Sequence, residues 1–313
     1  VTGHADAVVA DGEGAVVRPA ARRWAMIYRF LGVASFLLWA AAMVSLFVHD
    51  VLPEWTTQDP PRITVEQFRL LDEPLQQYRI VDGRDRRLGT AWSEVRFSGE
   101  MLRVCGTVVL DGLSMIPGLP KLIPTIRIQS EAHFDPEGAL DKFDMDVYGF
   151  LDQKIFVRGE RRGIYFPVEM QFGPLRREVP LDYAASRMIG DSLNPFACLP
   201  TLRVGQSWRM QVLDPLAAVL SGRTEFRSVV ARVTGKEMIS HPTEPGRTVE
   251  CYVVETTPES SKAWVDEKGR VFRQEADLPG VGRVTLIKEA YSADAREKAV
   301  TRRGAEAGPL QGD

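Results

Sequence analysis

The side chains best suited to covalent chemistry are three cysteines and two histidines spread over the chain: Cys105, Cys198, Cys251, His133 and His241. A cysteine nucleophile needs a base within hydrogen-bonding reach and a group that orients the base. The sequence pairs none of these residues, since His133 falls inside a predicted strand and His241 in a polar turn. The G-x-S-x-G pattern of hydrolases is absent as well. We therefore expect no catalytic residue and a chain that is not an enzyme.

The cysteine count also limits disulfide and metal chemistry. Three cysteines are too few for a disulfide scaffold. In an oxidising compartment two of them could pair and leave the third free; otherwise all three are buried thiols that pack as small apolar side chains. The C-x-x-C spacing of zinc and redox sites does not occur. We expect neither a bound metal nor another cofactor.

A cluster of acidic residues occupies the middle of the chain: Asp141, Asp144, Asp146 and Asp152. Its spacing is not that of an EF-hand loop, which leaves a calcium site of another kind or a solvated strand face as interpretations. Basic residues at Lys142, Lys154 and 158–162 could neutralise the cluster. The run 158–163 (RGERRG) is interpreted as a solvated hairpin tip, with contact to lipid headgroups as the alternative.

The segment Gly112–Pro124 (GLSMIPGLPKLIP) is apolar yet rich in proline and glycine. Proline prevents it from forming a central strand or a long helix. Such a loop either tucks under a sheet or lines a ligand mouth, or it contacts a membrane or a partner. The candidate residues for contact with an apolar ligand or partner are Leu113, Met115, Ile116, Leu119, Leu122 and Ile123.

The elements that would position these residues begin with an uncharged run of 19 residues, Phe30–Val48. As a helix this run would span roughly 30 Å, the thickness of the hydrocarbon layer. Arginines precede it and acidic residues follow it, which keeps the N-terminus in the cytoplasm. A cleaved signal peptide or a twin-arginine signal fits less well, because the run is too long and the residues after Arg23 match poorly.

We thus predict a disordered cytoplasmic tail over residues 1–25 and a transmembrane helix over 26–49 in a bacterial inner (cytoplasmic) membrane. A juxtamembrane linker and helix over 50–77 follow, with the helix at Val65–Gln77. An extracytoplasmic, periplasmic β-rich domain covers 78–292 and a disordered tail 293–313. Further helical spacing occurs at Tyr183–Ile189 and Pro215–Leu220.

The β-rich region alternates short β-branched and aromatic runs with turn residues. The predicted turns are 135–138, Gly159-Glu160 and 266–269. The predicted strands are Glu94–Ser98, Leu102–Leu110, Thr125–Phe134, Leu140–Tyr148, Gln153–Arg158, Gly163–Met170, Ser207–Leu213, Glu225–Thr234, Thr248–Thr256, Lys262–Asp266, Val271–Leu278 and Gly282–Tyr291.

An internal repeat connects two parts of this region. At an offset of 131 residues, Ser130–Gly138 aligns with Ser261–Gly269, and four of the nine positions are identical. If the repeat is a true duplication, the halves are 78–180 and 200–292. The fold class is therefore mainly β with an N-terminal transmembrane helix. The β part is one or more curved antiparallel sheets or open half-barrels, either continuous or in two repeated halves, with a few short helices.

Three local motifs resemble a known family. Residues 263–275 (AWVDEKGRVFRQE) follow the pattern apolar-x-Asp-x-x-Gly-x-apolar-x-Arg, 202–208 (LRVGQSW) resembles a strand opener, and 87–91 (RLGTA) resembles a strand near the domain start. Together they resemble the lipoprotein-carrier-like (LolA/LolB-like) half-barrel and related uncharacterised bacterial envelope proteins. They also resemble the β-rich region of some bacterial transglutaminase-like proteins. The resemblance implies an open barrel around an apolar cavity that handles an acyl chain or a lipidated partner.

These observations favour a membrane-anchored extracytoplasmic binding or accessory module. Its partners would be the bilayer, through residues 26–49, and either a lipid or lipidated ligand or a membrane-protein partner. The formal net charge of −3 gives no basic excess to attract nucleic acid, so no such partner is expected. The alternatives are a structural or assembly protein of the cell envelope and an unrecognised hydrolase or transferase.

Overall fold

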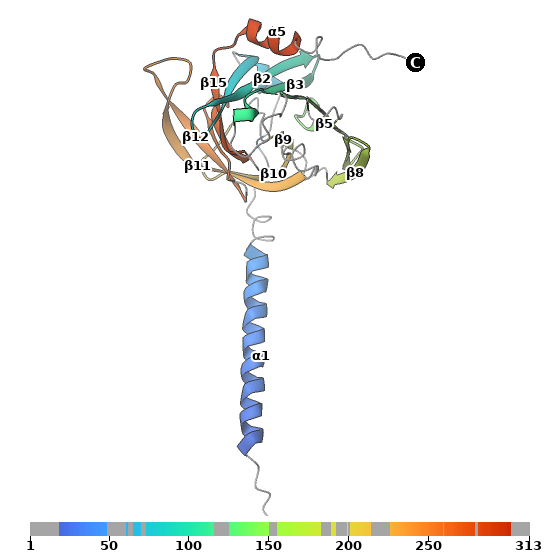
Figure 1. Cartoon of the computed structure of the whole chain (residues 1–313), viewed down its shortest axis with the longest axis vertical. Coiled ribbons are helices and arrows are strands. Elements are labelled where there is room, and N and C mark those ends of the chain that lie inside the picture. Colours follow the sequence, from blue (N-terminus) through green and yellow to red (C-terminus); the bar gives the residue numbers. More distant parts are fainter. Residues whose placement is uncertain are drawn as a thin grey trace, which may run out of the picture. The chain divides into compact units, whose positions relative to one another are not determined.

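The computed structural model describes residues 19–48, 61, 65–69, 73–115, 125–149, 155–182, 189–191, 199, 201–213, 226–258, 260–278 and 281–301. The chain divides into two units, Val1–Thr56 and Thr57–Asp313. The first contains helix α1 (Pro19–Leu46) (Figure 1). Its window Arg29–Leu46 has a mean hydropathy of 1.7, is not buried anywhere, and is long and apolar enough to cross a membrane. Because α1 starts at Pro19, residues 19–25 are helical and not part of a disordered tail.

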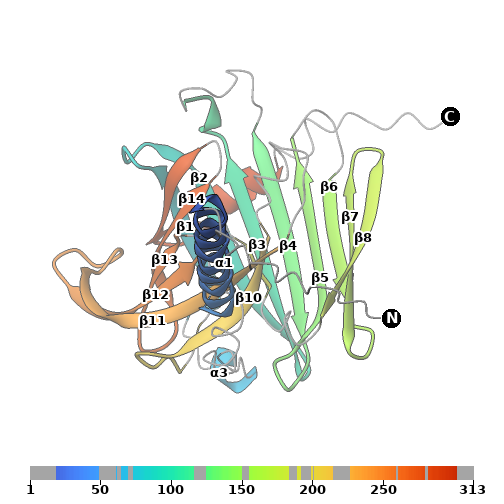
Figure 2. The same cartoon turned by 90° about the horizontal axis from the view of Figure 1, so that it is seen from below.

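The described part of the second unit is built on one curved sheet, which contains fifteen strands (Figures 1 and 2). Its order is β8-β7-β6-β5-β4-β3-β2-β1-β15-β14-β13-β12-β11-β10-β9. All pairs are antiparallel except β9 with β10. The strands are β1 (Leu75–Asp82), β2 (Arg87–Ser98), β3 (Met101–Leu110), β4 (Ile126–Phe134), β5 (Leu140–Tyr148), β6 (Ile155–Glu160), β7 (Tyr165–Phe172), β8 (Leu175–Asp182), β9 (Ile189–Asp191), β10 (Ser207–Leu213), β11 (Phe226–Ser240), β12 (Thr248–Thr257), β13 (Lys262–Val265), β14 (Val271–Leu278) and β15 (Gly282–Glu289).

The prediction of a curved antiparallel sheet is therefore confirmed, and the two proposed halves form one continuous sheet. The pairing of β1 with β15 joins them in the middle. Strands β5, β10 and β14 have the predicted bounds, and most others differ by a few residues. Whether the halves arose by duplication stays a prediction.

One face of the sheet, here called the inner face, carries the apolar core. In β5, Phe143, Met145 and Val147 are buried on this face, while the residues between them are not. One cluster of twenty buried residues extends over β1–β7 and β15 and includes Leu113 of the short helix η2 (Leu113–Met115). A second cluster joins β2, β3 and β10–β14 and includes Phe68, Leu199 and Leu202 from outside the sheet. The protein's own side chains thus cover the inner face where it is described.

Three hairpin turns share one design, which includes two of the predicted turns. Asp82, Asp135 and Asp266 each accept a hydrogen bond at the main-chain oxygen from the residue three positions later. That residue has a left-handed conformation at Asp85, Gly138 and Gly269 (φ 60°, 79° and 83°). This is the three-residue turn with a bulge that is common in antiparallel hairpins. The design also occurs between β1 and β2, so it is not restricted to the aligned segments.

The third predicted turn was wrong. Gly159 and Glu160 belong to β6, and the chain reverses at 161–164. An added Cβ at Gly159 would lie 2.2 Å from Cε1 of Phe166. Glycine stands there because an aromatic ring packs on the strand, not because the chain turns.

Three helix or tail predictions also need correction. The helix predicted at Val65–Gln77 ends at Arg69 (α3, Val65–Arg69), and Pro74 precedes β1, so the sheet begins before residue 78. Ile189, predicted as helical, lies in β9, while Tyr183 and Pro215–Leu220 lie outside the described residues. The predicted tail from residue 293 starts with helix α5 (Ala293–Thr301).

Candidate functional site

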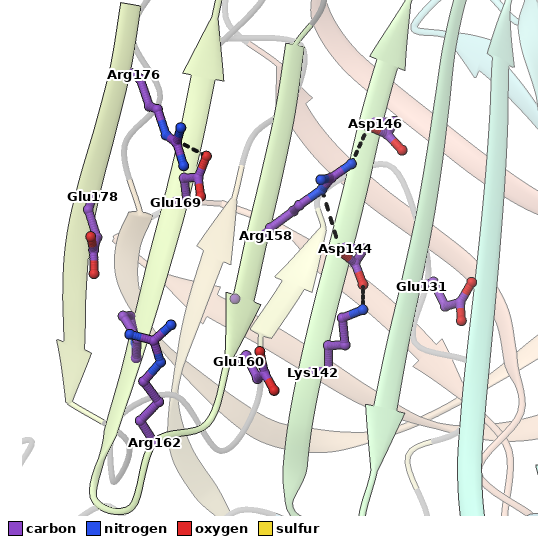
Figure 3. A pocket seen from close by; sticks show the side chains of 12 residues that line it. Glu131, Lys142, Asp144, Asp146, Arg158, Glu160, Arg162, Glu169, Arg176 and Glu178 are labelled. Carbon is purple, nitrogen blue, oxygen red and sulfur yellow. Dashed lines mark ion pairs between the residues drawn. The ribbon is translucent and has the colours of Figure 1, made fainter.

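The opposite, outer face of β4–β8 carries a groove of about 750 Å³ that is lined almost entirely by charged side chains (Figure 3). These side chains alternate with the core residues along each strand, which places them away from the apolar cluster. Six carboxylates and four cationic side chains line it: Glu131, Asp144, Asp146, Glu160, Glu169, Glu178, Lys142, Arg158, Arg162 and Arg176.

Strand register aligns the centre of this surface into one row that crosses β2–β8. The row, here called the acidic row, consists of Glu94, Cys105, Glu131, Asp144, Arg158, Glu169 and Glu178. A parallel row beside it contains Arg96, Arg103, His133, Lys142 and Glu160, and it ends in Pro167 and Pro180. Cations thus flank the carboxylates on β2–β5, whereas prolines flank those on β7 and β8.

Ion pairs neutralise most of the carboxylates near the centre of the sheet. Lys142 Nζ lies 3.0 Å from Asp144, and Arg158 lies 3.7 Å from Asp144 and 4.0 Å from Asp146. These contacts favour the interpretation of the sequence cluster as a charged strand face over a calcium site. Among the described residues no group of three or more His, Cys, Asp or Glu is placed to hold a metal ion. Asp152 lies outside them.

The end of the groove near β8 is less well neutralised. Glu169 and Glu178 are directly opposite each other on β7 and β8, an arrangement that repulsion disfavours. Arg176 Nε lies 2.7 Å from Glu169. No ion pair joins Glu178, Glu160 or Arg162 to a neighbour within the described part of the chain. Over the whole groove, six carboxylates against four cationic side chains leave an excess of two negative charges, and the carboxylates without an ion pair lie toward β8.

Cys105 and His133 lie on this same face but do not form a catalytic pair. Across the β3–β4 pair, Cys105 is opposite Glu131 and His133 is opposite Arg103, so the two residues are not cross-strand neighbours. His133 Nε2 lies 2.6 Å from Glu131 Oε1. Burial, with help from the Glu131 charge, raises the pKa of the Cys105 thiol. The thiolate that nucleophilic catalysis requires is therefore disfavoured.

Cys251 and His241 lie together at the other end of the sheet. The His241 ring packs at 4.9 Å on Phe272, which shares a buried cluster with Cys251. Burial raises the pKa of Cys251 to about 12, so this thiol acts as a small apolar side chain. Both described cysteines are free, and Cys198 lies outside the described residues.

The predicted apolar contact residues are described only in part. Leu113 is buried in the core and is therefore not open to a ligand in this structure. Met115 ends η2, and Ile116, Leu119, Leu122 and Ile123 lie outside the described residues. By contrast, the sequence interpretation missed Arg176 and Glu178, because β8 had not been predicted, and it missed Glu169 because the partner strand of Gly163–Met170 was not known. Alternation of charge along 175–182 was the signal that could have found them.

No protein-family model and no curated protein matches the chain. Among solved structures, it is similar to a β-barrel-like protein of unknown function from Brucella abortus (11% identity, 68% of this chain and 94% of that chain, TM-score 0.40). It is also similar to a DUF1089-family protein from Pseudomonas aeruginosa (15%, 61% and 90%, 0.35) and to a candidate lipoprotein from Parabacteroides distasonis (10%, 68% and 92%, 0.29). The resemblance to LolA/LolB-like carriers stays a prediction.

Proposed function

We propose that this chain is a membrane-anchored extracytoplasmic binding module that holds a protein partner of a membrane complex at its charged groove. One observation carries the proposal: large apolar side chains cover α1 and remain exposed, with Phe30 at 76% and Leu38 at 77%. Soluble proteins rarely leave so large an apolar surface in water. A lipid bilayer would cover it, and the arginines before it favour an extracytoplasmic β domain.

Two features make a protein partner a better candidate than a lipid inside the sheet. The inner face is covered by the protein's own side chains, and Leu113 belongs to that cover. The charged groove, in contrast, is open and ends at β8, the edge of the sheet. An edge strand offers main-chain groups to an added strand, while neighbouring side chains select its sequence.

The prolines indicate how a strand would be added. Pro167 and Pro180 are directly opposite, and neither has an N–H, so this pair is not hydrogen-bonded. Hydrogen-bonded and non-hydrogen-bonded pairs alternate along an antiparallel ladder, so Glu178 and Arg176, two and four residues before Pro180, also lie in non-hydrogen-bonded pairs with β7. Their main-chain N–H and C=O groups therefore point away from β7, to the open edge. A partner strand would thus bond at Arg176 and Glu178. A basic side chain of the partner strand, placed opposite Glu178, would pair with the last carboxylate of the acidic row.

Anchoring is tested by alkaline extraction of membranes and by a reporter fused after Asp313. We expect the chain to stay with the membrane until detergent is added, and the reporter to be extracytoplasmic. Release without detergent, or a cytosolic reporter, would contradict the anchored module.

Binding at the groove is tested by co-purification in mild detergent of the wild type and of Glu178→Lys. The charge reversal should strongly reduce recovery of the partner and change the free energy of unfolding by no more than about 0.5 kcal/mol, as for most surface substitutions. Glu267→Lys is the matched control, because Glu267 is exposed on the other half of the sheet. Equal loss in both variants, or none in Glu178→Lys, would remove the groove as the binding surface.

A further inference from the structure

Exposed apolar side chains of the β unit collect at one edge of the sheet. Among the described residues of this unit, the large exposed apolar ones are Phe97, Met101, Ile164, Tyr165, Leu175, Val204, Met238 and Tyr291. Phe97 and Met101 flank the turn from β2 to β3; Ile164 lies in the turn from β6 to β7, and Tyr165 starts β7. Because successive strands are antiparallel, β2, β4 and β6 all end at the same edge. Leu175 starts β8 at the opposite edge.

The chain enters the sheet at this same edge, here called the entry edge. Helix α3 lies at the lower edge of the sheet in Figure 2. Its Arg69 donates a hydrogen bond to the main-chain oxygen of Gly99 at 3.2 Å and lies over the Phe97 ring at 5.7 Å. Only residues 47–64 connect α1 to α3. Along the sequence, the chain between α1 and β1 thus passes through α3, which contacts the entry edge.

The hairpin tip at 161–165 (RRGIY) combines both kinds of side chain that interact with a membrane surface. Ile164 is 72% exposed, and Tyr165 and Arg162 beside it are exposed as well. Arg161 fixes the tip, because its Nη1 lies 2.9 Å from Asp135 in the neighbouring turn and its main-chain N–H donates to Asp141. These contacts hold the base of the tip, which reduces the ordering cost of presenting the apolar pair on binding.

We propose that the entry edge docks on the surface of the bilayer, with Ile164 and Tyr165 in the interface and Arg162 and Arg69 against anionic headgroups. This inference rests on the proposed membrane anchor and adds an orientation of the β unit. Tyrosine and apolar side chains flanked by arginine are the composition that favours the interfacial region. Docking at the entry edge would leave the opposite edge, with Leu175, in water.

The test places an environment-sensitive fluorophore on the full-length chain in nanodiscs that contain phosphatidylglycerol. It is attached at Ile164→Cys and, as matched control, at Leu175→Cys, in a background whose native cysteines are replaced by serine or alanine. The two positions are similarly exposed, at 72% and 69%, but lie at opposite edges. We expect a blue-shifted emission and quenching by brominated lipid at position 164, and neither at position 175.

Hydrogen exchange of the wild-type chain in the same nanodiscs and in detergent gives an independent readout, since the cysteine-free background can fail to fold. Slower exchange at 161–165 in the nanodisc than in detergent supports docking. Equal quenching at both positions, or at neither, together with unchanged exchange, overturns it. Protection at 161–165 only when a co-purified protein is present also overturns it, because the entry edge would then be a protein interface. In both cases alkaline extraction still reports the anchor separately.

Discussion

The two halves of the sheet contain the same kind of hairpin turn, but different side chains cover their outer faces. Over β4–β8 the outer face is a groove of charged side chains. Over β11–β14 it carries an apolar island of Cys251, Val253, Trp264 and Phe272, which are almost completely buried. Ile239 and Val249 pack against this island.

Charged side chains cover the island instead of lining a groove. Trp264 Nε1 donates to Glu237 at 2.8 Å, and Lys262 and Arg273 lie over the Trp264 ring at 4.8 Å and 4.9 Å. Hydrogen bonds from Trp264 and Lys262 lower the pKa of Glu237. In this half the charged side chains of Glu237, Lys262 and Arg273 make their contacts around the Trp264 ring. The comparison teaches that the same alternation gives a second core in one half and an open groove of charged side chains in the other.

The largest effect expected from this difference is on stability in the second half. Trp264→Ala should lower the free energy of unfolding by about 3–5 kcal/mol, because it removes a large buried side chain and one of the two hydrogen-bond donors to Glu237. Denaturant unfolding of the detergent-solubilised chain measures it. In the groove, Glu160→Ala should stay within about 0.5 kcal/mol of the wild type. Similar losses for both variants would mean that the two faces do not differ in role.

A smaller effect on stability is expected at the two aligned hairpin turns, which contain Asp266 and Asp135. The Asp266 carboxylate accepts the main-chain N–H groups of Lys268 and Arg270 and both Nε and Nη2 of Arg270. Asp135 accepts one main-chain N–H, from Ala139, and Arg161 of the next hairpin. Asp266→Ala should thus cost about 3 kcal/mol and Asp135→Ala about 1–2 kcal/mol of unfolding free energy. An equal or reversed order in denaturant unfolding would contradict this ranking.

The smallest effect is a dependence on pH at the junction of the halves, where α5 contacts the acidic row. Hydrogen bonds from Arg96, and then from Arg296 of α5, lower the pKa of Glu94 below its usual 4.5, although burial opposes this. A lowered pKa means that the contribution is present above about pH 4.5 and is lost as the pH falls through the folded-state value. Glu94→Gln should cost about 1 kcal/mol at pH 7 and little in acid. Hydrogen exchange of 293–301 at both pH values measures it, and an equal change at both would contradict it.

Most strands could be predicted because their alternation is strong and hairpin turns separate them. In β14, buried and less buried residues alternate from Phe272 to Asp277 after the turn at Gly269, and the bounds Val271–Leu278 were predicted correctly. Strand β1 was missed because Val65, Phe68, Leu71 and Leu75 also fit helical spacing. Pro74 breaks such a helix and was the overlooked signal.

The groove could be predicted only in part, since it depends on register. Asp144 and Asp146 were identified as a cluster because they share one strand, but Glu169 and Glu178 join them only through the pairing of β5–β8. Sequence patterns do not fix which residues of different strands are opposite. Pro174, just before β8, and Pro180 within it also made the segment 175–182 unlike a strand, although proline is compatible with an edge strand.

The β1–β15 pair has a consequence for how the protein is made. A chain that emerges from its N-terminus can form β1–β8 and, later, β9–β14 as separate meanders of neighbouring strands. Only residues 282–289 hydrogen-bond to both β1 and β14. Until they emerge, two incomplete sheets with open edges coexist, and such edges are prone to aggregate. The last strand synthesised therefore decides whether a nascent chain becomes one domain or remains a substrate for chaperones and proteases.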